Sequence, residues 1–311
     1  MLKIIFFGSP IYTTHIIDQL RHLKYELLAV VTQNEKRGKR GKISKTPVAL
    51  YAEKNKLKVF APTELNDKKF IQEIQKLNPD LILIFAYGKI LPLNLIKIPQ
   101  YGCLNIHASI LPKWRGAAPI QHTILSGDNK TGVTFFKINE ELDKGDIVAT
   151  HEFEISKDDD AISLQLKLSQ LAAHHLEETI KKTIDDSILT KQDESKSSYA
   201  NKILKDQCII DWNESAEMIV LKVKAFVGWP VAEALILGSS VRIWSALSIG
   251  TDTTHKPGKV VGLDKHGLMI STKKGILNIQ KLQLPGKNII TASDLSNSNS
   301  SFATLIKKEI K

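Results

Sequence analysis

Two polar residues suited to stabilising a negatively charged oxygen lie at the end of an apolar run near the middle of the chain. The run is GCLNIHA (102–108), and it places Asn105 and His107 two positions apart. Because alternate residues of a strand point to the same face, the amide and the imidazole would project together. Such a pair can hold a carbonyl oxygen that becomes an oxyanion, and His107 can also carry a proton near neutral pH. Taken alone, the pair is explained more simply by backbone groups that need partners at a strand end.

The residues that follow this run favour a rigid turn. Pro112 removes a backbone donor and fixes φ, so the strand cannot continue past it. The turn would expose backbone groups of residues 109–112 to a ligand. The sequence does not determine whether the Leu111–Pro112 peptide bond is cis or trans.

A carboxylate is available further along the chain, after a predicted strand at 132–138. Asp143 and Asp146 lie in a turn marked by Gly145. A buried carboxylate beside His107 would orient the ring and favour its protonated form. Ordinary turn chemistry also explains both aspartates, and the sequence alone does not bring this turn next to the histidine.

Apolar runs that alternate with helical patterns must position these residues. The expected strands are 2–7, 26–32, 57–62, 80–86, 102–108 and 132–138, and the expected helices are 12–23, 47–56, 67–77, 118–127 and 161–184. This alternation predicts an α/β fold with a largely parallel, doubly wound sheet, which binds ligands at the carboxyl ends of its strands. The first turn, GSP, lacks the G-x-G-x-x-G pattern, which argues against a dinucleotide site of the usual kind.

The pattern changes near residue 185, where a polar stretch rich in Ser, Lys and Asp begins. After about residue 206, short strands separated by glycine turns favour a small β-barrel, preceded by a helix at 215–226. We therefore expect a first domain at 1–188, a linker at 189–205 and a second domain at 206–311.

Composition narrows the class of protein. Of the 311 residues, 42% are apolar, which suffices for a sizeable core, and no apolar run approaches the ~20 residues of a membrane span. Two cysteines far apart give no disulfide or zinc framework and suit a reducing cytoplasm. The net charge is +10. All charged residues of KRGKRGKISK (36–45) are basic. From charge alone, a solvated loop is a slightly better explanation than a polyanionic partner.

The segment NIHASILPKWRGAAPIQHTILSGDNKTGVTFFKINEELDKGDIV (105–148) resembles the active-site region of the folate-dependent formyltransferases. These enzymes share Asn-x-His, then Ser-x-Leu-Pro, then Leu-Asp-x-Gly. The stretch LPKWRGAAPIQ is similar to the methionyl-tRNA formyltransferase family in particular. Further segments extend the resemblance to nearly the whole chain: VTQNEKRGKRGK, FAYGKILP, IDWNESA, AFVGWP and PGKNI.

The resemblance implies a formyltransferase fold of Rossmann-like type, an OB-like second domain, and transfer of a formyl group from 10-formyltetrahydrofolate to methionine on initiator methionyl-tRNA. It implies that Asn105 and His107 bind the oxyanion, and that Asp143 pairs with His107 and helps to move the amine proton. Asp146 is the weaker candidate, because the aspartate of the family pattern Leu-Asp-x-Gly corresponds to Asp143. No metal is expected. The residues expected to bind folate are Ser109, Ile110, Leu111, Pro112, Ala86, Tyr87, Gly88, Ile90 and Leu91.

The resemblance also implies that the basic loop enters the acceptor stem of the tRNA. The basic residues expected to meet the tRNA are Arg37, Arg40, Lys42, Lys113 and Arg115. The loop departs from the family pattern at EKRGK, so which of its residues meets the acceptor end is left open. Lysines of the second domain would meet the tRNA backbone, with ordinary solvation as the alternative: Lys256, Lys259, Lys265, Lys273, Lys274, Lys281 and Lys287. We expect a cytoplasmic monomer without a membrane partner.

Three other functions share part of this pattern. A formyltransferase acting on a small amine would use the same Asn, His and Asp but would have less need of a basic loop and second domain. A 10-formyltetrahydrofolate hydrolase is expected to carry a preceding regulatory domain, whereas this sequence begins at its first predicted strand. A non-enzymatic RNA-binding protein would not need the intact trio of candidate catalytic residues.

Overall fold

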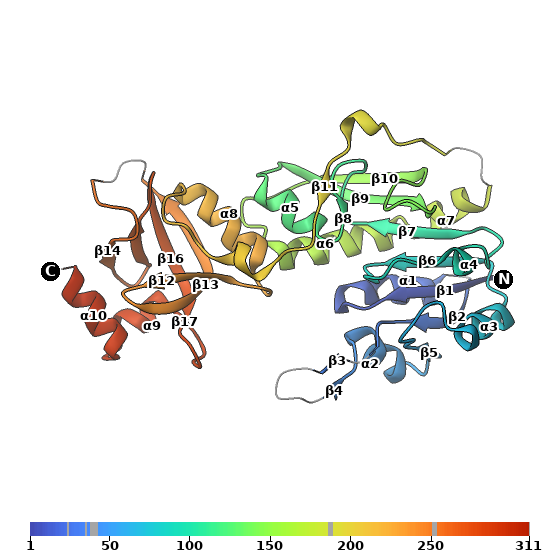
Figure 1. The fold of residues 1–311 in the computed structure, drawn as a ribbon, viewed down its shortest axis with the longest axis horizontal. Helices are drawn as coiled ribbons and strands as arrows, with labels where there is room; N and C mark the ends of the chain where they lie inside the picture. The colour runs from blue at the N-terminus through green and yellow to red at the C-terminus, as the bar shows by residue number, and fades with distance from the viewer. Residues whose placement is uncertain (24, 35, 38–42, 186–188, 251–253, 311) are drawn as a thin grey trace. The chain divides into compact units, whose positions relative to one another are not determined.

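The computed structural model describes residues 1–311 except 24, 35, 38–42, 186–188, 251–253 and 311 (Figure 1). It divides into two compact units, which are described separately below. The first comprises residues 1–119, 130–155 and 165–201, and the second comprises 120–129, 156–164 and 202–311. The expected linker, 189–205, thus contributes residues to both units, and the domain limits stay a prediction.

The first unit contains a seven-stranded sheet in the order β10-β9-β7-β6-β1-β2-β5. The strands are β1 Leu2–Gly8, β2 Tyr25–Val31, β5 Val59–Phe60, β6 Leu81–Phe85, β7 Cys103–His107, β9 Lys130–Lys137 and β10 Ile147–Glu154. Pairs among β5, β2, β1, β6 and β7 are parallel, whereas β9 runs antiparallel to both β7 and β10. The predicted mostly parallel α/β sheet is confirmed.

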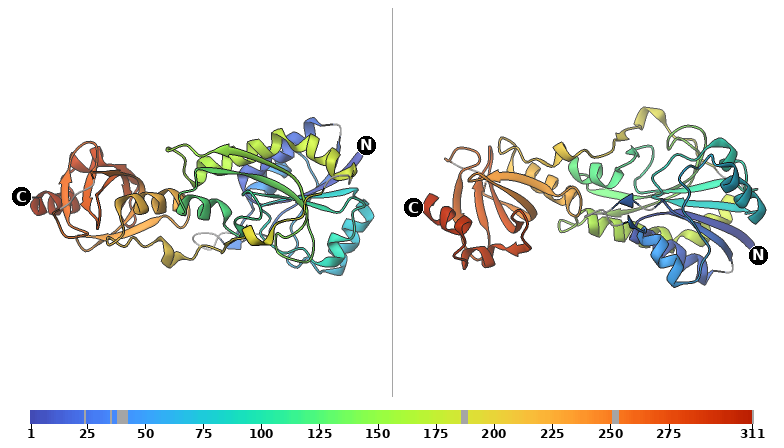
Figure 2. Two further views of the ribbon diagram at one scale, coloured as in Figure 1. Left: turned by 90° about the horizontal axis from the view of Figure 1, so that it is seen from above. Right: turned by 60° about the horizontal axis from the view of Figure 1, so that its bottom comes forward.

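Continuous apolar runs form the central strands because helices cover both faces of the sheet. In β1, Ile4, Ile5, Phe6 and Phe7 are all 0% exposed, although successive side chains point to opposite faces. The face with Ile5 and Phe7 packs against apolar residues of α3 Lys68–Leu77. Helix α6 Ala161–His174 lies on the other side of the sheet, as the left view of Figure 2 shows.

Several of the remaining helices of this part of the chain begin at or directly after a proline. They are η1 Ile11–Thr13, α1 Thr14–His22, α2 Pro47–Lys54, α4 Leu93–Ile96, α5 Pro119–Leu125, of which residues 120–125 belong to the second unit, and α7 Leu176–Asp185. Helix α2 shows the rule: Pro47 is its first residue, and the Thr46 side chain accepts a hydrogen bond from the Ala49 amide. The predicted single helix at 161–184 is wrong in one respect, because His175 separates α6 from α7.

Three short strand pairings lie outside the main sheet. In the basic loop, β3 Lys36–Arg37 pairs with β4 Ile43–Ser44. Within the expected linker, β11 Tyr199–Ala200 pairs with β8 Arg115–Gly116, and Thr190 bridges to Ile147. Residues 190–200 also contain η3 Glu194–Lys196. This polar segment therefore adds backbone pairing to the first unit.

The second unit is built around an antiparallel sheet in the order β12-β13-β16-β15-β14, with β17 paired to β16. Its strands are β12 Ala232–Ile236, β13 Ser239–Ile249, β14 Val260–Leu263, β15 Leu268–Ser271, β16 Ile276–Gln283 and β17 Ile289–Thr291. Its helices from residue 202 onward are η4 Lys205–Cys208, α8 Ala216–Phe226, α9 Ala292–Ser296 and α10 Ser301–Glu309. Apolar residues of α8, α9 and α10 join those of the sheet in one core. The prediction of a small C-terminal β-domain is confirmed as an antiparallel sheet.

Candidate active site

Asn105 and His107 lie on one face of β7, as their spacing predicts, and His107 is buried. His107 Nε2 lies 2.8 Å from the carbonyl oxygen of Trp114. Since a carbonyl only accepts hydrogen bonds, Nε2 carries a proton and Nδ1 is the nitrogen that can take up another. The Asn105 side chain is half-buried and has no hydrogen-bond partner among the described residues. A hydrogen bond to a backbone group thus accounts for one nitrogen of His107, but no such bond accounts for the Asn105 amide.

Asp143 is brought to His107 by the loop between β9 and β10. Its Oδ2 lies 3.7 Å from His107 Nδ1 and accepts a hydrogen bond of 2.7 Å from the Gly116 amide. The His–Asp distance exceeds that of a hydrogen bond, so the two groups face one another without a direct bond. The Asp143 side chain is 12% exposed. Its backbone has a φ of 53°, a conformation that Asp tolerates better than most residues.

The loop that carries Asp143 is held tightly at its end. A Cβ atom on Gly145 would lie 1.6 Å from the Lys137 carbonyl oxygen, so only glycine fits there. The backbone carbonyl of Asp146 accepts a hydrogen bond from the Lys137 amide. The structure therefore gives the carboxylate beside His107 to Asp143, as the family pattern implies.

The turn expected to bind folate is fixed from the side of the sheet. Thr134, on β9, donates a hydrogen bond to the Ser109 carbonyl and accepts one from the Leu111 amide. The Ser109 hydroxyl donates to the Lys113 carbonyl, so this side chain closes the turn. Leu111 is buried, Ile110 and Pro112 are partly exposed, and the Leu111–Pro112 bond is cis.

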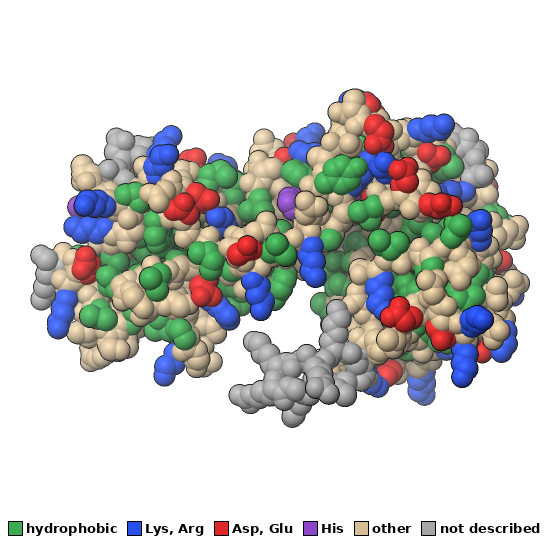
Figure 3. Space-filling model, in the orientation of Figure 1, with side chains coloured by type: hydrophobic (Ala, Val, Ile, Leu, Met, Phe, Trp, Pro, Cys, Tyr) green, Lys and Arg blue, Asp and Glu red, His purple; other side chains and the backbone are tan. Residues whose placement is uncertain are grey.

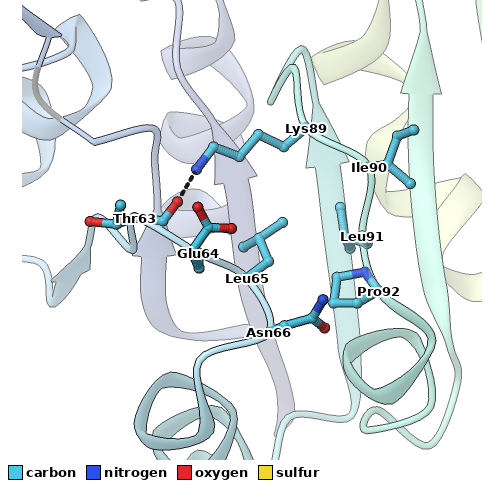
Figure 4. A pocket seen from close by; sticks show the side chains of 8 residues that line it. All are labelled: Thr63, Glu64, Leu65, Asn66, Lys89, Ile90, Leu91 and Pro92. Atoms are coloured by element: carbon cyan, nitrogen blue, oxygen red, sulfur yellow. Dashed lines mark hydrogen bonds between the residues drawn. The ribbon is translucent and has the colours of Figure 1, made fainter.

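The second segment expected to bind folate, 86–91, follows β6. Tyr87 and Leu91 are buried, whereas Ile90 is 82% exposed. Ile90 and Leu91, together with Lys89 and Pro92, face residues 63–66 across a pocket of about 450 Å³ (Figure 4). The Lys89 ammonium donates to the Thr63 carbonyl and so joins the two walls of this pocket.

Of the residues expected to meet tRNA, some lie outside the described part of the chain and others are exposed. Arg40 and Lys42 lie outside the described residues, and Arg37 is described only as part of the backbone of β3. Lys113 is exposed, with its ammonium 5.3 Å from the centre of the Trp114 ring. All seven lysines named for the second domain are exposed. Lys and Arg side chains are interspersed with acidic ones on the face drawn in Figure 3.

Arg115 does not fit the expected role of a tRNA contact. Its side chain is 0% exposed and donates to Gln192 and to both carboxylate oxygens of Glu194, at 2.7–3.0 Å. Hydrogen bonding to Glu194 raises the pKa of this guanidinium above its usual value. A buried cation with these partners would lose them on turning to a phosphate, so the arginine holds protein segments together instead.

Sequence reasoning did not identify Gln192, Glu194 or Thr134 as residues around the site. The first two lie in a polar stretch with the composition of a linker, and Thr134 looks like any β-branched residue of a strand. The described residues contain no group of three or more His, Cys, Asp or Glu side chains placed to hold a metal ion. Nor does any described helix have the length and apolarity needed to cross a membrane.

The chain belongs to the formyl transferase family. The model of the formyl transferase domain matches residues 2–180, and that of the formyl transferase C-terminal domain matches residues 202–300. A methionyl-tRNA formyltransferase of Coxiella burnetii is 39% identical over 300 residues, which cover 96% of each chain. One of Nitrosococcus oceani is 36% identical over 299 residues, covering 95% of this chain and 93% of the relative.

The fold is shared with solved structures of lower sequence identity. HypX from Aquifex aeolicus, in complex with tetrahydrofolic acid, matches with a TM-score of 0.66 and 20% identity. The match covers 95% of this chain and 47% of HypX. The two domain models and the curated relatives confirm the family expected from the sequence, and the solved structures add a shared fold.

Proposed function

We propose that this chain transfers the formyl group of 10-formyltetrahydrofolate to the α-amine of methionine on initiator methionyl-tRNA. The curated relatives that share 36–39% identity over nearly the whole chain carry the name of this activity. One observation in the structure carries the chemistry: the unpaired amide of Asn105 lies on the same face of β7 as His107, and His107 faces Asp143.

The reaction begins when the uncharged amine attacks the formyl carbon, so that a C–N bond forms and the carbonyl oxygen becomes negative. Asn105 donates a hydrogen bond to this oxygen, which is the kind of stabilisation that usually contributes most in acyl transfer. An amine nitrogen about 2.8–3.0 Å from both His107 Nδ1 and Asp143 Oδ2 can donate to each, since these atoms are 3.7 Å apart.

The proton balance assigns the roles of these two groups. The amine loses one proton to the His107–Asp143 pair, and N10 of the folate gains one as its bond to the formyl carbon breaks. Nε2 of His107 stays bound to the Trp114 carbonyl throughout, so the ring works through Nδ1. The products are a formylated amine and tetrahydrofolate. That this transfer needs no metal ion stays a prediction.

The folate donor is assigned to the turn 109–112 and the segment 86–91. Tetrahydrofolate bound to HypX, which shares this fold, supports a folate ligand. The turn presents backbone groups on a rigid base, because Thr134 holds it at two points. The pocket that includes Ile90 and Leu91 provides a hollow beside the second segment.

The tRNA is assigned to Arg37, Arg40 and Lys42 of the basic loop, to Lys113, and to the exposed lysines of the C-terminal unit. Arg115 is left out of this set because it is buried and bonded. We place the reaction in the cytoplasm, where charged initiator tRNA is used, and we propose that the chain acts as a monomer.

The decisive experiment measures formyl transfer from 10-formyltetrahydrofolate to several acceptors in parallel. Charged initiator tRNA is compared with free methionine, an amino sugar nucleotide and water. Fast transfer to the charged tRNA alone supports the proposal. Transfer only to a small amine, or hydrolysis without transfer, would keep the chemistry but reject tRNA as the acceptor.

Asn105→Ala tests the assigned chemistry with the same assay. Loss of the oxyanion donor should lower kcat by on the order of 10²–10³, with little change in the KM of either substrate. A kcat near that of the unmodified chain would show that the amide serves only the fold.

A further inference from the structure

One glutamine outside the motifs of the active site bonds to two of its loops at once. Gln192 Nε2 donates hydrogen bonds of 2.8 Å to the backbone carbonyls of Asp143 and Gly145. Its Oε1 accepts two more from the Arg115 guanidinium, at 3.0 and 2.7 Å. One side chain therefore links the loop of Asp143 to the turn that precedes α5.

The bonds on the arginine side hold that turn in place. Arg115 is 0% exposed, and its charge is balanced by Glu194, which lies two positions after Gln192 in the same segment. The turn is the one whose Trp114 carbonyl accepts from His107 Nε2 and whose Gly116 amide donates to Asp143. Arg115 thus sits between the two backbone groups that orient the two candidate catalytic side chains.

The segment around Gln192, residues 190–200, also bonds to the turn and to the end of the Asp143 loop through Ser198 and Thr190. Residues 190–200 bond to the turn through Ser198, whose hydroxyl accepts from the Trp114 amide and whose carbonyl accepts from the Arg115 amide. Thr190 exchanges two backbone hydrogen bonds with Ile147, the first residue after the Asp143 loop. The segment consequently bonds to both loops, and the Gln192 side chain adds a further link between them.

We infer that Gln192 is a positioning residue for formyl transfer, holding Asp143 at its working distance from His107. This inference rests on the proposed function. Asp143 has a left-handed backbone conformation, which its neighbours must stabilise, and the Gln192 amide binds the carbonyl of that same residue. If this bond is lost, the carboxylate is free to move relative to His107, and misplacement by about 1 Å can cost ~10²-fold in rate.

Glutamine suits this position because the two loops present opposite hydrogen-bonding groups. The carbonyls of Asp143 and Gly145 need a donor, and the Arg115 guanidinium needs an acceptor. Gln192→Glu keeps an acceptor for Arg115, replaces the donor to the two carbonyls by a carboxylate oxygen, and adds a negative charge. It therefore separates positioning of the loop from support of the buried arginine.

The experiment compares Gln192→Glu with Gln72→Glu, the same chemical change at an exposed position of α3. We expect Gln192→Glu to lower kcat by about 10–100-fold while the KM for folate and for charged tRNA changes less than about threefold. Gln72→Glu should leave both constants near those of the unmodified chain. Equal kcat in the two variants, or a change confined to KM, would overturn the inference.

A double-mutant cycle asks whether Gln192 acts through Asp143. In the background of Asp143→Asn, Gln192→Glu should cost less than about twofold in kcat, because the group it positions is already impaired. Full additivity of the two effects would overturn the inference. If Gln192→Glu does not fold, Gln192→Met serves instead: it removes the donor to the Asp143 and Gly145 carbonyls without adding a charge and should lower kcat several-fold, whereas unchanged kcat would overturn the inference.

A substrate-free measurement keeps this inference distinct from the proposed function. Hydrogen exchange at the Gly116 amide reports its bond to Asp143 Oδ2 directly. Faster exchange at Gly116 in Gln192→Glu than in Gln72→Glu supports the inference even if charged tRNA is not the acceptor. Equal exchange in the two variants overturns it, whatever the enzyme formylates.

Discussion

Thr134→Val is the substitution whose effect follows most directly from the structure. The hydroxyl of Thr134 donates to the Ser109 carbonyl at 2.7 Å and accepts from the Leu111 amide at 3.0 Å. Thr134 is 0% exposed, so water does not reach these groups from outside. Valine has nearly the same shape, and the change therefore removes two hydrogen bonds with little change in packing.

The cost can be estimated from the two backbone groups left unpaired. Each buried orphan costs about 1–3 kcal/mol, so we expect a loss of ~2–6 kcal/mol in the stability of the turn. Because residues 109–112 are assigned to folate, the KM for 10-formyltetrahydrofolate should also rise, by on the order of tenfold.

Thr183→Val supplies a matched control. Thr183 is also buried, but its hydroxyl only donates to the Thr179 carbonyl within α7. Its loss should cost about 0.5–1.5 kcal/mol and leave folate kinetics unchanged. The assay is hydrogen exchange of peptides from the first unit, combined with steady-state kinetics. Equal destabilisation by the two variants, with folate KM unaltered in both, would refute the reasoning.

Two further predictions concern charge. Arg40→Ala should lower kcat/KM for charged tRNA about tenfold and reduce the salt dependence of binding by about one unit of slope, with Lys54→Ala, at an exposed position of α2, as control. Unchanged tRNA kinetics at physiological salt would contradict the loop assignment. The rings of His151 and His175 stack at 3.5 Å, and burial lowers the pKa of both. Their neutral forms therefore support the fold above about pH 6.5, and this support is lost as the pH falls towards the lowered values. His175→Gln should reduce the loss of unfolding free energy between about pH 7.5 and 5.5, unlike His22→Gln on α1; equal pH dependence would exclude the stacked pair as its source.

The sequence predicts the sheet well because its central strands are buried on both faces. β6 is an unbroken apolar run and β1 carries one at residues 4–7, and runs of this length are typical of strands buried on both faces. The break at His175 escapes such reasoning, since Leu171, Leu176 and Ile180 continue the helical pattern across it. Contacts with β10, including the stack on His151, lie outside what periodicity can report.

The candidate site was predictable only as far as short motifs reach. Asn105 and His107 follow from strand geometry, whereas the approach of Asp143 depends on a loop that folds back over the sheet and was expected only from the family resemblance. Gln192 was hidden, because a polar, serine-rich stretch has the same composition whether it is solvated or bonded to two loops. Its partners are backbone carbonyls and a distant arginine, and none of these leaves a local pattern in the sequence.

The antiparallel direction of β9 has a consequence for how this chain can vary. β9 ends beside Leu104, at the start of β7, so the loop after it must return along the sheet before Asp143 reaches His107. Residues 139–142 of this loop are exposed, so insertions or deletions there would change only chain that faces solvent. Between Asp143 and Gly145 the spacing is fixed by close backbone contacts. Length variation among relatives should therefore cluster before the aspartate and stop at it.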